Sequence, residues 1–169
     1  FSDIINIIVC KQGSDKMQIA ICDDEKSTCA EIESYILMYS KLRFIRNEIE
    51  VFYSGEAFCE YVKQGNFFDL LFLDIELPAI NGIEVGKFVR TSLGDEKMDI
   101  IYISSKINYA MQLFQNRPMD FLVKPVKYSA VEMNMDIFVK KKGIKSIYFE
   151  CLVDKVSRRV FLSEILYFK

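Results

Sequence analysis

Two hydrophobic patterns alternate along the chain: short, nearly continuous apolar runs, and longer stretches in which apolar residues return every three or four positions. The first pattern is typical of strands in a parallel sheet covered on both faces, and the second of amphipathic helices. The apolar runs predict strands over residues 17–22, 48–53, 67–74, 98–104 and 120–123. The stretches between them predict helices from just after residue 25 to about 40, and over 54–63, 82–90, 108–114 and 129–141.

Strand and helix therefore alternate five times with short connections. Because such crossovers are right-handed and adjacent, the alternation predicts an α/β fold with a parallel sheet wrapped by helices on both faces. In an open sheet of this kind, ligands bind at the carboxyl ends of the strands. The residues that follow four of the strands are then expected to gather at one edge of the sheet. They are Asp23, Asp24, Asp74, Ser104 and Lys124.

The third strand is the centre of this arrangement. Its large apolar residues stop abruptly at Asp74, and a Leu-Pro pair and an Asn-Gly pair follow as turn signals. Asp74 is therefore predicted to be the reactive residue at the end of a strand that is buried on both faces.

The chemistry of the gathered residues indicates a site for a divalent cation. Three crowded carboxylates repel one another, and oxygen ligands suit Mg²⁺. A carboxylate beside Mg²⁺ can attack phosphorus, so Asp74 is expected to become an acyl phosphate. Ser104 would donate a hydrogen bond to the phosphoryl group, and Lys124, aimed by a cis bond to Pro125, would supply a positive charge. Taken alone, Asp23 or Asp24 could instead cap the helix that follows.

Composition removes several other kinds of site. The 169 residues are 51% hydrophobic, enough for one full core and the beginning of a second. The absence of histidine excludes His-based zinc sites, Ser-His-Asp triads and Cys-His dyads. Five cysteines without a Cys-x-x-Cys pair are expected to be free thiols. No apolar stretch approaches the roughly 20 residues of a membrane span, so we expect a cytoplasmic protein without a membrane partner.

Four motifs occur in order on the expected elements. They are Asp23-Asp24 after the first strand, Asp74-x-x-Leu-Pro-x-x-Asn-Gly, Ser104 and Lys124-Pro125. With them, residues 17–126 resemble the receiver domain of bacterial two-component response regulators. The resemblance implies a flavodoxin-like doubly wound sheet of strand order 2-1-3-4-5. It also implies a phosphoacceptor domain, not an enzyme, in which a sensor histidine kinase transfers its phosphoryl group to Asp74.

The resemblance also implies roles for individual residues. Mg²⁺ would be bound by Asp24, Asp74 and the backbone carbonyl of Glu76, with Asp23 acting through water. Phe121 matches the aromatic residue whose ring moves inward when the Ser104 hydroxyl is drawn to the phosphoryl group, although a buried aromatic on a strand is usually core. Glu76 and Lys106 would flank the path of the hydrolytic water, and we expect their opposite charges to pair and slow its approach.

Two other classes of protein use parts of this pattern. A haloacid-dehalogenase-like phosphatase also has a strand-end Asp and Mg²⁺, but it needs a second Asp two residues later, where this chain has Glu76. A flavodoxin-like binding module needs a Ser/Thr/Gly-rich loop after the first strand, where this chain has acids.

The ends of the chain differ from its centre. Residues 1–16 fit the alternation poorly, and Met17 resembles a natural start, so we expect an extension over 1–16 and a receiver domain over 17–142. The net charge is −6 over residues 1–126 (13 basic, 19 acidic) and +4 over 127–169 (9 basic, 5 acidic).

Two strand-like runs, 144–153 and 159–168, predict a β segment within residues 143–169, with an Arg-Arg pair near the turn. Residues 159–168 are similar to the opening of a LytTR-type DNA-binding domain, and the chain is expected to end inside that domain. The resemblance implies DNA as a partner of the longer protein. Whether phosphorylation promotes a homodimer or releases an inhibited effector stays open.

Overall fold

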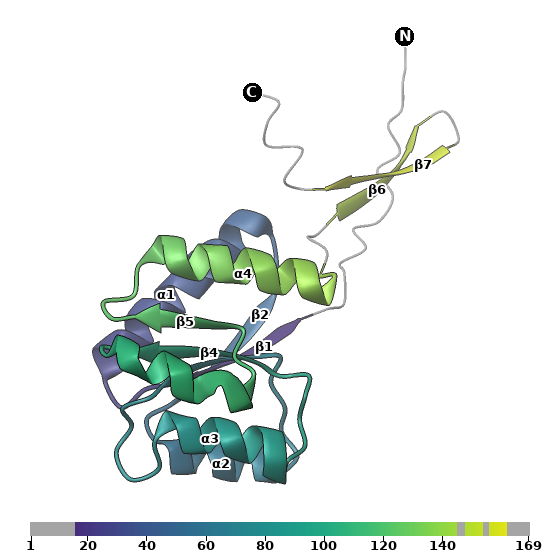
Figure 1. The fold of residues 1–169 in the computed structure, drawn as a ribbon. Helices are drawn as coiled ribbons and strands as arrows, with labels where there is room; N and C mark the ends of the chain where they lie inside the picture. Colours follow the sequence, from purple (N-terminus) through teal and green to yellow (C-terminus); the bar gives the residue numbers. More distant parts are fainter. Residues whose placement is uncertain (1–15, 145–147, 154–155, 162–169) are drawn as a thin grey trace.

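A computed structural model describes residues 16–144, 148–153 and 156–161. A five-stranded parallel sheet has the order β2-β1-β3-β4-β5, which confirms the expected flavodoxin-like topology (Figure 1). The strands are β1 (Met17–Cys22), β2 (Asn47–Phe52), β3 (Leu70–Asp74), β4 (Asp99–Ser104) and β5 (Asp120–Val123). The helices are α1 (Lys26–Arg43), α2 (Gly55–Lys63), α3 (Gly82–Lys87), η1 (Phe88–Ser92), η2 (Ile107–Asn116) and α4 (Tyr128–Lys142).

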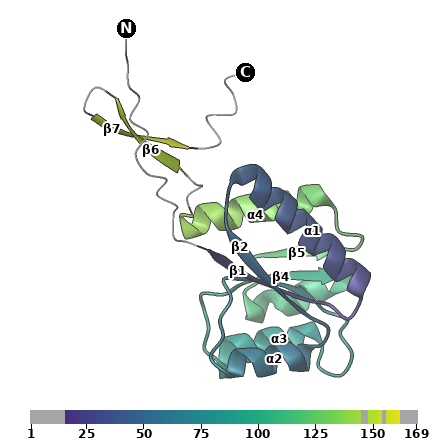
Figure 2. The same ribbon diagram turned by 180° about the vertical axis from the view of Figure 1, so that it is seen from behind.

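Helices cover both faces of the sheet: α1 and α4 lie on one side and α2 and α3 on the other (Figures 1 and 2). All five residues of β3 are buried, as the continuous apolar run predicts. Its side chains alternate between the two cores, since Leu71 and Leu73 pack on the α2/α3 side while Leu70 and Phe72 pack on the α1/α4 side. The central strand is thus held from both faces, which makes its end a rigid support for Asp74.

The turn after β3 depends on one glycine. A Cβ atom on Gly82 would lie 2.1 Å from the backbone oxygen of Asp74, so only glycine fits at this position. Asn81 begins α3 with a capping box, in which its side chain accepts from the Glu84 N–H and the Glu84 side chain accepts from the Asn81 N–H. The Asn-Gly pair of the sequence therefore folds the chain tightly back against the strand end that carries Asp74.

Several predicted boundaries were wrong. The stretch predicted as a helix over 82–90 is α3 followed by the π-helical turn η1, and the short helix predicted over 108–114 is a ten-residue 3₁₀-helix, η2. Helix α1 continues to Arg43, where Phe44 ends it in a left-handed conformation. Periodicity does not separate α-helix from 3₁₀- or π-helix, because all three place apolar residues about one turn apart.

The C-terminal part forms a second, two-stranded antiparallel sheet, β6 (Tyr148–Val153) with β7 (Val156–Phe161). This hairpin confirms β structure after α4, although the second strand begins earlier than the predicted run over 159–168. The predicted extension over residues 1–16 lies, except for residue 16, outside the described residues, and so do residues 162–168. Within the described part of the chain, no helix has both the length and the apolar character needed to cross a bilayer.

Candidate functional site

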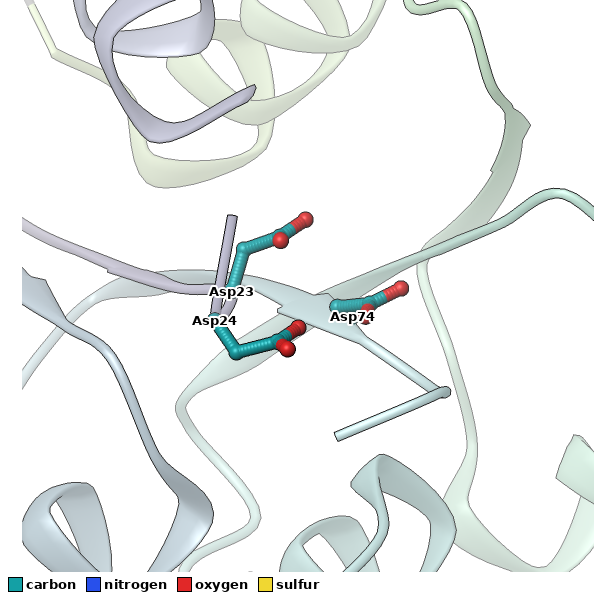
Figure 3. A group of neighbouring side chains, drawn as sticks. All are labelled: Asp23, Asp24 and Asp74. Carbon is teal, nitrogen blue, oxygen red and sulfur yellow. The ribbon is translucent and has the colours of Figure 1, made fainter. Parts of the chain in front are cut away.

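The carboxyl edge of the sheet brings together the strand-end residues that the sequence singled out. Asp23 and Asp24 follow β1, and Asp74 is the last residue of the adjacent β3. The carboxylates of these three residues extend to the same side of the sheet edge (Figure 3). One oxygen from each carboxylate lies within 4.8 Å of those of the other two. Acids from two separate strands therefore form one cluster, as the fold predicts.

The environments of the three acids differ. Asp23 and Asp74 are 0% and 1% exposed, whereas Asp24 is exposed at the mouth of the site. Neither Asp23 nor Asp24 caps α1, because Glu25 occupies the N-cap position and its carboxylate accepts from the hydroxyls of Ser27 and Thr28. Asp23 Oδ1 accepts from the Glu25 N–H at 2.9 Å. The helix start thus orients Asp23 and leaves Asp24 without a capping role.

Lys124 provides the positive charge opposite the acids. Its Nζ lies 2.8 Å from Asp23 Oδ2 and 3.3 Å from Asp74 Oδ1. These two oxygens are buried and have no well-oriented hydrogen bond, so the ammonium neutralises them mainly by charge. The Lys124–Pro125 peptide bond is cis, as the sequence led us to expect, and the Lys124 N–H donates to the Ser104 carbonyl at 3.0 Å. The end of β4 therefore anchors the backbone that carries the ammonium.

Charge and burial raise the pKa of Asp74. Burial is the largest cause of the rise, and the neighbouring Asp23 carboxylate is the second. Lys124 and the Glu76 N–H lower the pKa, which leaves it at about 6. Burial by itself would lower the pKa of Lys124, but the short contact with the Asp23 carboxylate and the negative charges of both acids raise this pKa above its ordinary value. Lys124 is thus an ammonium at neutral pH, and Asp74 is a carboxylate that gains from further positive charge.

Ser104 occupies the predicted position but contacts a different group. Its side chain is fully buried, and its Oγ lies 3.4 Å from Glu76 Oε2. The Lys106 N–H donates to the same Oγ at 2.9 Å. Glu76 also accepts from the Ser105 hydroxyl at 2.5 Å and forms an ion pair with the Lys106 ammonium. The predicted pairing of Glu76 with Lys106 is therefore present, and its effect on hydrolysis stays a prediction.

Sequence reasoning missed Ser105. The only available signal was that a second hydroxyl residue follows Ser104 directly, and nothing in the pattern showed that it would face Glu76. Together with Lys106, the Ser105 hydroxyl lowers the pKa of Glu76 to about 2, the Lys106 contact being the larger cause. Phe121 is partly buried and packs against the core on the α2/α3 side, which fits both a core residue and a switch residue.

A cavity of about 610 Å³ lies beside the acids, between the start of α1 and the loop from β5 to α4. Its lining includes Glu25, Thr28, Lys124 and Pro125. Because Lys124 belongs to this wall and also contacts Asp23 and Asp74, the cavity adjoins the acidic cluster on the α1 side.

The acidic cluster fits Mg²⁺ by the nature and spacing of its ligands. Mg²⁺ binds oxygen at about 2.0–2.1 Å, so two oxygens bound directly to it lie at most about 4.2 Å apart. The 4.8 Å limit of the cluster is compatible with an ion held by these carboxylates, directly or through water.

Comparison with known proteins agrees with this geometry. The family model described as "Response regulator receiver domain" matches residues 19–136. The sensory transduction protein LytT of Oceanobacillus iheyensis is 28% identical over 132 residues, which cover 78% of this chain and 52% of the relative. The transcriptional regulatory protein NatR of Bacillus subtilis is 24% identical over 144 residues, covering 83% and 58%. The chain spans little more than half the length of these relatives.

Solved structures share the fold. The response regulatory domain of mrkE from Klebsiella pneumoniae superposes with a TM-score of 0.64 at 23% identity, covering 74% of this chain and 97% of that domain. A structure described as a putative response regulator from Chloroflexus aurantiacus gives 0.65 at 20% identity, covering 75% and 99%. At these identities the likeness concerns the fold alone.

Proposed function

This chain belongs to the response regulator receiver domain family, and from that membership we propose that Asp74 accepts a phosphoryl group from a sensor histidine kinase. The observation that carries the proposal is the buried Asp74 carboxylate, which belongs to the acidic cluster and faces the Lys124 ammonium. A receiver of this kind is a regulatory domain, and its own chemistry is limited to gaining and losing that phosphoryl group.

The residues divide the transfer among them. An Asp74 carboxylate oxygen attacks phosphorus, the phosphorus–nitrogen bond of the donor phosphohistidine breaks, and the imidazole leaves with its electron pair and takes up a proton. Lys124 neutralises charge on the phosphoryl oxygens during transfer. Asp24, Asp74 and the Glu76 backbone carbonyl would hold Mg²⁺, with Asp23 acting through water, and the ion would supply the remaining positive charge. Ser104 would donate its hydroxyl to the new phosphoryl group, and Phe121 would then turn inward.

The two alternatives are less well supported. A haloacid-dehalogenase-like phosphatase needs a protonated acid two residues after the nucleophile to protonate the leaving group. Glu76 stands there, and its pKa of about 2 keeps it ionised while Lys106 and Ser105 occupy its oxygens. A flavodoxin-like module would need a loop of hydroxyl and glycine residues after β1, but this loop contains Asp23, Asp24 and Glu25.

We further propose that the longer protein regulates transcription through a LytTR-type DNA-binding domain that begins near residue 143. Three observations support this proposal: the β6–β7 hairpin after α4, the positive charge of residues 127–169, and relatives named as a sensory transduction protein and a transcriptional regulatory protein. The protein would act in the cytoplasm, with the receiver over 17–142. A homodimer formed on phosphorylation is one way to transmit the signal.

The test is incubation with Mg²⁺ and acetyl phosphate, followed by intact mass measurement and peptide mapping. We expect one added phosphoryl group on Asp74 that is absent without Mg²⁺ and absent in Asp74→Asn. Asp69→Asn is the matched control, because Asp69 lies just before β3 at the opposite edge of the sheet, and it should be phosphorylated normally. Turnover of a generic phosphate ester, or labelling that persists in Asp74→Asn, would contradict the proposal.

A further inference from the structure

One carboxylate binds three consecutive residues of the loop that joins β4 to η2. Glu76 Oε2 lies 2.5 Å from the Ser105 hydroxyl oxygen and 3.4 Å from that of Ser104, while Oε1 contacts the Lys106 ammonium. Glu76 stands two residues beyond β3, so these contacts join the loop after β3 to the loop after β4. The pair of loops is the region that has to rearrange if Ser104 is to reach a phosphoryl group on Asp74.

The Ser104 hydroxyl has one proton to donate. Its oxygen already accepts from the Lys106 N–H at 2.9 Å, and the nearest acceptor for its proton is the Glu76 carboxylate. Ser104 itself is fully buried. A phosphoryl group on Asp74 and the Glu76 carboxylate therefore compete for the same proton.

We propose that Glu76 is a positioning residue that holds Ser104 and the β4–η2 loop in the unphosphorylated arrangement, so that the phosphoryl group must displace it. This inference rests on the proposed phosphorylation of Asp74. A phosphoryl group adds close to two negative charges, which repel the neighbouring carboxylate while attracting the hydroxyl. Glu76 contacts Ser104 in the unphosphorylated arrangement and loses this contact when the hydroxyl moves to the phosphoryl group. The contact therefore stabilises one of the two states only, as a switch requires.

The displacement would extend into η2. Lys106 pairs with Glu76 at one end of the loop, and its Nζ lies 6.0 Å from the centre of the Tyr109 ring in the first turn of η2. Helix η2 is a 3₁₀-helix over ten residues, longer than the three or four residues usual for this conformation. Release of Glu76 would therefore also free Lys106, the N-cap residue of η2.

The test uses beryllofluoride with Mg²⁺ as a non-hydrolysing phosphoryl mimic, and the wild type, Glu76→Ala and Glu76→Gln as matched proteins. Beryllofluoride affinity and the backbone amide signal of Lys106 are both read from ¹⁵N-labelled protein by NMR. Alanine removes the Glu76 acceptor of the Ser104 hydroxyl, so the beryllofluoride affinity of Glu76→Ala should rise about 2- to 3-fold. This is the low end of the net value of one hydrogen bond, because the contact is 3.4 Å long. The Lys106 amide of ligand-free Glu76→Ala should also move toward its beryllofluoride-bound position.

Glutamine separates positioning from charge, because it keeps an acceptor oxygen while losing the negative charge. A smaller gain for Glu76→Gln than for Glu76→Ala supports the positioning role. Equal gains in the two variants would mean that charge alone is responsible, and no gain in Glu76→Ala would likewise overturn the inference. If wild-type protein binds no beryllofluoride, the proposed function itself fails. Ser105→Ala, which removes one contact without touching Glu76, should give a smaller gain of the same sign.

Discussion

The buried negative charge of Asp74 should cost folding stability when no cation is present. Asp74 is 1% exposed, and its pKa in the folded protein is raised from 3.8 to about 6. The folded state therefore binds its proton more tightly than the unfolded state does. The protonated Asp74 carboxyl stabilises the folded state fully below about pH 4, and this stabilisation is lost as the pH rises through 6. Replacing Asp74 by Asn, which stays neutral, should remove this loss.

The pKa difference sets the size of the effect. One unit of pKa difference corresponds to about 1.4 kcal/mol, so Asp74→Asn should be more stable than the wild type by about 3 kcal/mol at pH 7.5. The same linkage reduces the advantage to about 1 kcal/mol at pH 4.5, where folded Asp74 is largely protonated. These two differences in unfolding free energy are upper values, because the structure around the charge relaxes.

Urea unfolding followed by circular dichroism, with EDTA present and at several pH values, measures the difference. Asp69→Asn serves as the control at the other end of β3 and should not reproduce the pH dependence. Mg²⁺ should then stabilise the wild type more than Asp74→Asn, by about 1.4 kcal/mol at a concentration ten times the dissociation constant. Equal stabilities at pH 7.5 in EDTA, or a difference that does not shrink toward pH 4.5, would show that the buried charge of Asp74 does not destabilise the fold.

Three further predictions concern buried residues of the receiver fold. Gly86→Ala should destabilise the fold by about 2–3 kcal/mol in urea unfolding, because the added Cβ would lie 1.7 Å from the buried Tyr102 hydroxyl. Adding Tyr102→Phe to this variant should restore part of the lost stability. Arg90→Lys should cost about 2 kcal/mol by the same measurement, since the buried guanidinium donates to three backbone carbonyls that one ammonium cannot span. Cys22 should resist alkylation at pH 8 in native protein and react in denaturant, as peptide mapping would show, because burial raises its thiol pKa.

The order of strands and helices could be predicted from the sequence because each element has its own hydrophobic period. The continuous apolar run of β3 indicated burial on both faces, and an abrupt change to Asp74 marked its end. Once the sheet is parallel, the ends of its strands share one edge. The gathering of Asp23, Asp24, Asp74 and Lys124 therefore followed from local pattern and topology together.

The winding of the shorter helices could not be predicted in the same way. Contacts that are distant in sequence join η1 and η2 to each other and to the sheet. Arg90, for example, joins η1 to the carbonyl of Asn116 at the end of η2, and Asn116 in turn donates to Ile83 and Tyr102. A hydrophobic period records which face is buried, and it carries no information about such tertiary hydrogen bonds.

The identity of the residues at the strand ends can be derived without a structure, because apolar runs and turn signals are local properties of the chain. The partners of those residues come from the packed fold: Ser104 faces Glu76, Ser105 joins the same carboxylate, and burial raises the pKa of Asp74. The physical reason is that hydrogen-bond geometry and desolvation depend on atoms from separate strands, whose side-chain positions follow only from the packed fold.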